Sequence, residues 1–93
     1  MSATAYGIVN ANGSKRSGEG FSSIKVDNGH YMISFVPKFS TPPSVVVSVV
    51  EEGFSWNAVV LAVTEDNCRI ETGNPRKGGD AADDIPFSFI AMG

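Results

Sequence analysis

Apolar and polar residues alternate along much of the chain with a period of two, which is the spacing of a β-strand. In residues 31–36, Tyr31, Ile33 and Phe35 share one face, and their bulk places that face toward the core. No segment shows the apolar stripe of an amphipathic helix. The pattern predicts seven strands, at residues 5–9, 21–26, 31–36, 44–50, 56–64, 68–72 and 85–92.

The segments between these strands carry turn and loop residues. The pair Asn28–Gly29 predicts a two-residue hairpin turn of type I′, in which both residues have positive φ. Residues 10–20 are rich in glycine, asparagine and serine and predict a surface loop. Prolines at 37, 42 and 43 cannot donate to a ladder and should end the flanking strands. Together these signals predict an all-β fold, an antiparallel β-sandwich of about six or seven short strands.

Three predicted strands, 44–50, 56–64 and 85–92, carry apolar residues on both faces. A small sandwich that stays monomeric exposes a polar face on each strand. A second copy of the chain is the simplest cover for the additional apolar face. The pattern therefore predicts a homo-oligomer, and the alternative is a monomer with irregular patterning.

Composition narrows the class of protein and its partners. The 93 residues suit a single domain spanning residues 1–93. The net charge is −3 and the 7 basic residues are dispersed, which argues against nucleic acid and an anionic membrane surface as partners. No apolar run approaches the ~20 residues of a membrane span, and the N-terminus lacks a signal-peptide pattern. We expect a chain made in the cytoplasm and not inserted in a membrane.

Residues suited to catalysis or metal binding are sparse. With Cys68 as the one cysteine and His30 as the one histidine, neither an intrachain disulfide nor a Cys/His zinc site can form. The Gly-x-Ser-x-Gly motif of serine hydrolases is missing, and the paired acidic residues lie in predicted turns, where both are solvated. Oxygen ligands in residues 74–84 do not have the spacing of a calcium-binding EF-hand. We expect no enzyme activity, cofactor or metal; a hydrolytic site would need a second chain to complete it.

Two regions hold candidate ligand-binding residues. Trp56 and Asn57 combine an aromatic platform with a planar amide, which suits a sugar ring and its hydroxyls. Arg76 and Asp80, in the long polar loop 73–84, add charged hydrogen-bond partners. The structural alternatives are a core or subunit-interface role for Trp56 and a solvated loop around Arg76.

A family resemblance rests on four segments in order: Gly20–Phe21, Gly29–Phe35, Phe39–Val47 and Pro86–Gly93. This order resembles the small β-sandwich modules that end phage tail fibres and related bacterial fibre proteins. It is also similar to the H-type lectin domain, which shares a Phe-Ser-x-Pro-Pro-x-Val segment and an Ile-Ala-hydrophobic-Gly ending. The resemblance covers roughly residues 6–93.

The resemblance implies a homotrimer, or a hexamer of two trimers, whose loops or subunit junctions recognise a carbohydrate. It also implies a place in a phage or tail-like particle, either as an excised fibre tip or as a self-contained protein without a shaft. The sugar-contacting positions of the lectins do not align with this chain, so no residue role is transferred. We therefore predict a non-catalytic module that binds a cell-surface glycan. The alternative is a structural module for oligomerisation or particle assembly that binds proteins.

Overall fold

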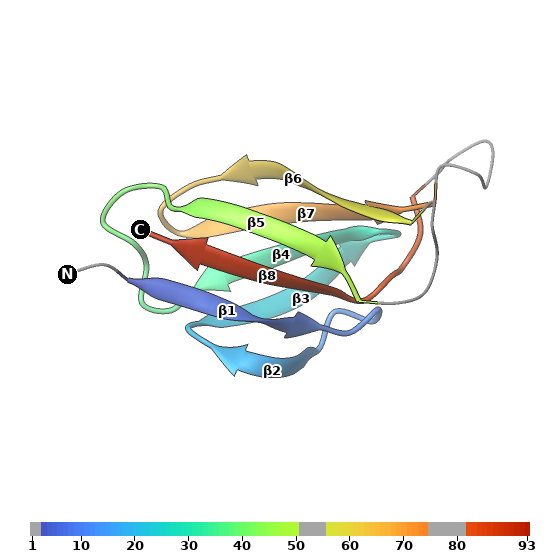
Figure 1. Cartoon of the computed structure of the whole chain (residues 1–93), viewed down its shortest axis with the longest axis horizontal. Helices are drawn as coiled ribbons and strands as arrows, with labels where there is room; N and C mark the ends of the chain where they lie inside the picture. The colour runs from blue at the N-terminus through green and yellow to red at the C-terminus, as the bar shows by residue number, and fades with distance from the viewer. Residues whose placement is uncertain (1–2, 51–55, 75–81) are drawn as a thin grey trace.

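Two antiparallel four-stranded sheets pack face to face, which confirms the predicted all-β sandwich (Figure 1). The computed structural model describes residues 3–50, 56–74 and 82–93. Sheet A has the strand order β2-β1-β8-β5, and sheet B has the order β3-β4-β7-β6. The described residues include no helix that is long and apolar enough to cross a membrane. The strands are β1 (Thr4–Val9), β2 (Lys15–Glu19), β3 (Phe21–Asp27), β4 (His30–Phe35), β5 (Ser44–Val49), β6 (Asn57–Val63), β7 (Asn67–Gly73) and β8 (Phe87–Met92).

The strand register defines two ends of the sandwich. At one end Thr4 lies opposite Met92, and the Gly93 N–H donates to the Ala3 carbonyl at 3.0 Å. Residues 3 and 93 therefore lie together at this end. The β3–β4 hairpin, the end of β7 and the start of β6 lie at the opposite end (Figure 1). We call this opposite end the loop end.

The core is built from the inward faces of both sheets. Phe21 of β3 packs edge to face on Phe89 of β8 with ring centroids 4.8 Å apart, so the pair joins the two sheets. Phe39, from the β4–β5 connection, packs edge to face on Phe35 with ring centroids 4.9 Å apart and closes the core. Burying one such aromatic side chain is worth about 1.5–3 kcal/mol. The core residues are Ala5, Val9, Phe21, Tyr31, Ile33, Phe35, Phe39, Cys68, Ile70, Phe87, Phe89 and Ala91.

The sequence prediction of a loop over residues 10–20 is wrong for its second half, where β2 pairs with β1. This strand has no apolar residue, so the alternation that marks the other strands is missing. Its place is set by backbone geometry instead. Gly18 has φ of 110°, and a Cβ there would lie 2.0 Å from the Tyr6 carbonyl oxygen. Glycine is therefore required where β2 approaches β1.

The predicted hairpin at Asn28–Gly29 is present and joins β3 to β4. It is not the predicted type I′ turn, because only Gly29 has positive φ, at 70°. A register shift between Lys25 and Asp27 bends β3 as it enters the turn and changes the geometry that the turn must match. A Cβ on Gly29 would also lie 2.7 Å from the Thr72 carbonyl oxygen, so the turn packs directly on β7.

The remaining strand limits agree with the pattern to within one or two residues, with one change of face. The sequence pattern places Ala58, Val60 and Ala62 on one face of β6. A register shift between Val60 and Ala62 turns Val63 inward instead, and Ala62 is exposed. The prolines bound the strands as expected: β4 ends before the cis Val36–Pro37 bond, and β8 begins after Pro86.

Candidate functional site

Two of the four predicted ligand-binding residues lie at the loop end. Trp56 is half-buried and directly precedes β6, and Asn57 is exposed at its first position. The other two, Arg76 and Asp80, lie outside the described residues. Trp56 is thus neither a fully buried core residue nor a fully exposed one.

The ladder of sheet B brings the flanks of these regions together. Asn57 pairs with Gly73 at the end of β7, and Gly73 forms an isolated bridge with Ala82. We call these three paired residues the loop-end strip. The strip places the start of β6 next to Gly73, which precedes the segment 75–81 that contains Arg76 and Asp80. Ala82, which follows that segment, pairs with the opposite edge of Gly73. Trp56 and Asn57 therefore lie at the same end of the molecule as the described residues that flank this segment.

A hydrogen-bond network around Asp84 lies next to the loop-end strip. Asp84 accepts hydrogen bonds from Lys25 Nζ at 2.5 Å and from the Gly29 N–H at 2.7 Å. Thr72 Oγ1 donates to the Asp83 carbonyl at 2.5 Å, and the Asn28 side-chain amide donates to the Ala82 carbonyl at 2.9 Å. These bonds fix the segment entering β8 against the β3–β4 hairpin and β7. In these bonds the polar groups satisfy one another within the protein.

Tyr31 lies in the core near the Asp84 network. Its ring is fully buried against Phe87, and its hydroxyl donates to the Ala11 carbonyl at 2.7 Å. Burial first, and then the nearby Asp84 carboxylate, raise the pKa of Tyr31 above its usual value of 10.0. The hydroxyl therefore acts as a neutral hydrogen-bond donor that holds the β1–β2 connection to the sandwich.

Within the described ranges, the ionisable side chains show no arrangement for metal binding, since no group of three or more His, Cys, Asp or Glu residues converges. Asp84, one of the oxygen ligands considered from the sequence, is engaged by Lys25 and Gly29 instead. His30 lies 3.1 Å from Glu71 on the outer face of sheet B. Both are partly solvated, so this pair has the character of a surface contact.

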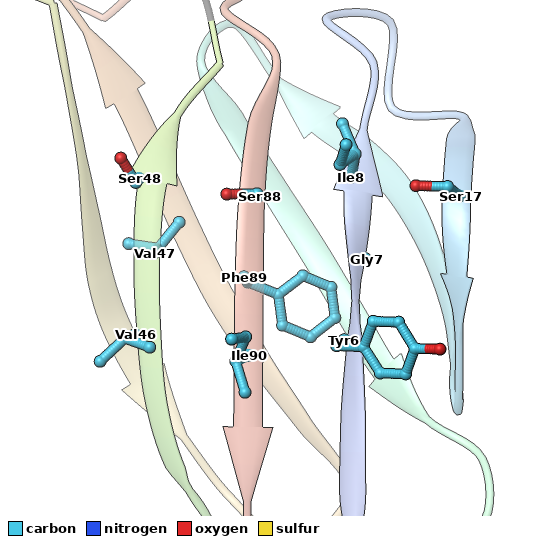
Figure 2. A pocket seen from close by; sticks show the side chains of 10 residues that line it. All are labelled: Tyr6, Gly7, Ile8, Ser17, Val46, Val47, Ser48, Ser88, Phe89 and Ile90. Atoms are coloured by element: carbon cyan, nitrogen blue, oxygen red, sulfur yellow. The ribbon is translucent and has the colours of Figure 1, made fainter.

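A shallow groove of about 440 Å³ crosses the outer face of sheet A (Figure 2). Its described lining includes neither Trp56 nor Asn57. The short serine side chains leave a hollow between larger apolar neighbours, and none of the described residues that line it is charged. The strand register sets two rows of side chains across the groove: Tyr6, Ile90 and Val46, and beside them Ile8, Ser88 and Ser48.

The groove was not predicted, although the second apolar face of strands 44–50 and 85–92 was. Val46 is 66% exposed, Met92 55% and Ile90 47%, so this face is apolar and open to solvent in the single chain. This apolar face could be predicted because its residues occupy alternate positions along each strand. The rows form only after three distant segments are aligned, and the sequence pattern alone does not give that alignment.

Comparison with models of protein families gives no match for this chain, and comparison with the sequences of curated proteins gives none either. The fold defines the class as a small antiparallel β-sandwich. The resemblance to fibre-tip modules and to the H-type lectin domain stays a sequence-based prediction.

Proposed function

We propose that this chain is a non-catalytic binding module that recognises a surface carbohydrate at its loop end and acts as a homotrimer. The loop-end strip carries the proposal, because it puts the start of β6 next to Gly73, and Gly73 in turn pairs with Ala82. Gly73 and Ala82 flank the segment that holds Arg76 and Asp80. A half-buried indole offers an apolar face to a sugar ring, and the exposed amide offers both a donor and an acceptor to its hydroxyls.

The position of the loop end supports this role. Residues 3 and 93 lie at the other end of the sandwich, so the loop end faces away from both (Figure 1). The hydrogen-bond network around Asp84 holds the flanking backbone in place, which lowers the entropic cost of ordering a binding site. Such an arrangement suits the tip of a fibre on a phage or tail-like particle, which is the setting we propose.

A glycan array with the purified oligomer tests the proposal. We expect Trp56→Ala and Arg76→Ala each to weaken binding to the recognised saccharide at least about tenfold. Leu61→Ala and Arg69→Ala are matched controls, because both residues are exposed on the outer face of sheet B. If a folded oligomer binds no saccharide above background, or if the test and control variants bind equally, the carbohydrate proposal is wrong.

The second candidate is a structural module for oligomerisation or particle assembly. The uncharged groove and the exposed Ile90, Met92 and Val46 favour it, because a contiguous apolar face suits a protein partner. Light scattering on a sizing column separates the cases when combined with the array. A mass of three or six chains with no glycan binding favours assembly, and a mass of three or six chains with glycan binding favours the first proposal.

A further inference from the structure

Each sheet ends in two edge strands, and three of these four edges carry features that block pairing with another strand. All four edge strands lie wholly within the described residues. In β2, β3 and β6 the ladder contains a register shift, and β2 and β3 also carry charged residues. Bulges and edge charges are the usual means by which proteins prevent edge-to-edge association.

The fourth edge, β5, has none of these features. Its sequence Ser-Val-Val-Val-Ser-Val contains no charge, glycine or proline, and its pairing with β8 is regular along its whole length. Its neighbour across the sandwich, β6, pairs with β7 in the other sheet and does not cover this edge with a ladder. Among the four edge strands of the described chain, β5 is therefore the one to which a further strand can be added without meeting a bulge or a charged residue.

The direction of the free peptide groups of β5 follows from the hydrogen bonds at its end. The Val50 N–H donates to the Pro86 carbonyl at 2.9 Å, which makes this a hydrogen-bonded pair of the β5–β8 ladder. In an antiparallel ladder such pairs alternate along the strand. Val46 therefore bonds to β8, whereas the peptide groups of Val45 and Val47 point toward the open edge.

The sequence of β5 matches itself in the antiparallel direction. Residues 44–48 read Ser-Val-Val-Val-Ser, which is a palindrome centred on Val46. In a two-fold pairing about Val46, Val45 lies opposite Val47 of the second copy, and both present their free peptide groups there. Val46 lies opposite its own counterpart on the outer face. Each requirement of an isologous strand pair is thus met by one short segment.

We propose that β5 pairs antiparallel with β5 of a second copy of this chain, about a two-fold axis at Val46, so that the two copies of sheet A become one continuous sheet. The groove supports this arrangement. The row Tyr6–Ile90–Val46 leads directly to the open edge, and it continues across the axis into the same row of the partner. The inference rests on the edge and not on carbohydrate binding. With the proposed trimer it gives a hexamer, and without it a dimer.

Sedimentation analysis of the full chain tests the stoichiometry. A mass of two or six chains supports the two-fold pairing, and a mass of one or three chains overturns it. Val46→Lys places like charges at the axis and should halve the mass. Ile24→Lys is the matched control, since Ile24 is 59% exposed and lies on β3 of the other sheet. If Val46→Lys keeps the wild-type mass, the proposed axis is wrong. An equal mixture of Val46→Lys and Val46→Glu should restore the larger species, because opposite charges then meet.

Cross-linking checks the register directly. Opposed residues of a pair without hydrogen bonds have Cα atoms about 4.5 Å apart, within the range that a disulfide spans. Val46→Cys should therefore give a disulfide-linked dimer under mild oxidation, whereas Ile24→Cys should not. The native Cys68 is fully buried and does not compete. Absence of a link in Val46→Cys, with the protein folded, overturns the pairing even if the mass indicates a dimer.

Discussion

Lys25 Nζ lies 2.5 Å from Asp84 Oδ2 and joins the middle of β3 to the segment that enters β8. The other carboxylate oxygen of Asp84 accepts the N–H of Gly29 in the β3–β4 turn. One side chain thus connects three separate parts of the loop end. Each side chain of the ion pair is about one-third exposed, so solvent weakens the charge interaction, and the backbone hydrogen bond matters at least as much.

Replacing Asp84 by alanine should lower the free energy of unfolding by about 1–3 kcal/mol, because it leaves the Gly29 N–H and Lys25 without this acceptor. Urea denaturation followed by tryptophan fluorescence measures the change. Asp84→Asn should cost less, since an amide oxygen can still accept from Gly29. Equal losses in the two variants would show that the ion pair alone matters.

Phe89→Ala should destabilise the fold by about 3–5 kcal/mol, because it opens a cavity in the contact with Phe21 that joins the sheets. Ile90 is the adjacent residue on β8 and faces outward, so Ile90→Ala should cost less than about 1 kcal/mol. Thermal and urea unfolding of the two variants give the comparison. A small effect of Phe89→Ala would mean that the two sheets do not pack as described.

Gly18→Ala should destabilise β2 by more than about 1 kcal/mol, because alanine is strained at φ of 110° and its Cβ would meet the Tyr6 carbonyl. Hydrogen exchange of the β1 amides should then become faster on the side that faces β2. Ser17→Ala, at the neighbouring exposed position, should leave exchange unchanged. Slow exchange in the Gly18 variant would contradict the close approach of β2 and β1.

Stability should fall as the pH rises from about 9 to about 11, and Cys68 is one cause. Burial raises the pKa of the Cys68 thiol from 9.0 to about 11. The unfolded chain therefore loses its thiol proton at lower pH than the folded chain does, which favours unfolding across this interval. The raised pKa of Tyr31 acts in the same direction at higher pH.

The free energy of unfolding of Cys68→Ala should depend less on pH in this interval than that of the native chain. Urea unfolding at several pH values measures both. Iodoacetamide should modify Cys68 slowly in the folded protein and rapidly in urea. Fast modification of the folded chain would show that the thiol is accessible.

The sequence pattern predicted the parts of the fold that depend on side-chain alternation. The inward face of Tyr31, Ile33 and Phe35 follows from a period of two, and the Asn28–Gly29 hairpin follows from its turn residues. The strand β2 depends on backbone approach at Gly18 and leaves no apolar pattern to detect. The bulge in β6 leaves no sequence pattern either, so the prediction of which face Val63 occupies was wrong.

The candidate sites could also be predicted only in part from the sequence. Trp56 and Asn57 could be chosen from their side-chain chemistry, but their position next to Gly73 depends on the pairing of β6 with β7. The groove depends on the alignment of β1, β8 and β5, which no local pattern specifies. The open edge of β5 could be recognised only after its place in the sheet order was known.

Several of the described interactions at the loop end are made by residues that flank the segments 51–55 and 75–81. Val50 bonds to Pro86, Gly73 pairs with Ala82, and Asp84 bonds to the β3–β4 turn. These interactions use residues outside the two segments. In the proposed binding module, substitutions within the two segments would leave the residues that form these anchors unchanged, so recognition could diversify while this part of the framework is retained.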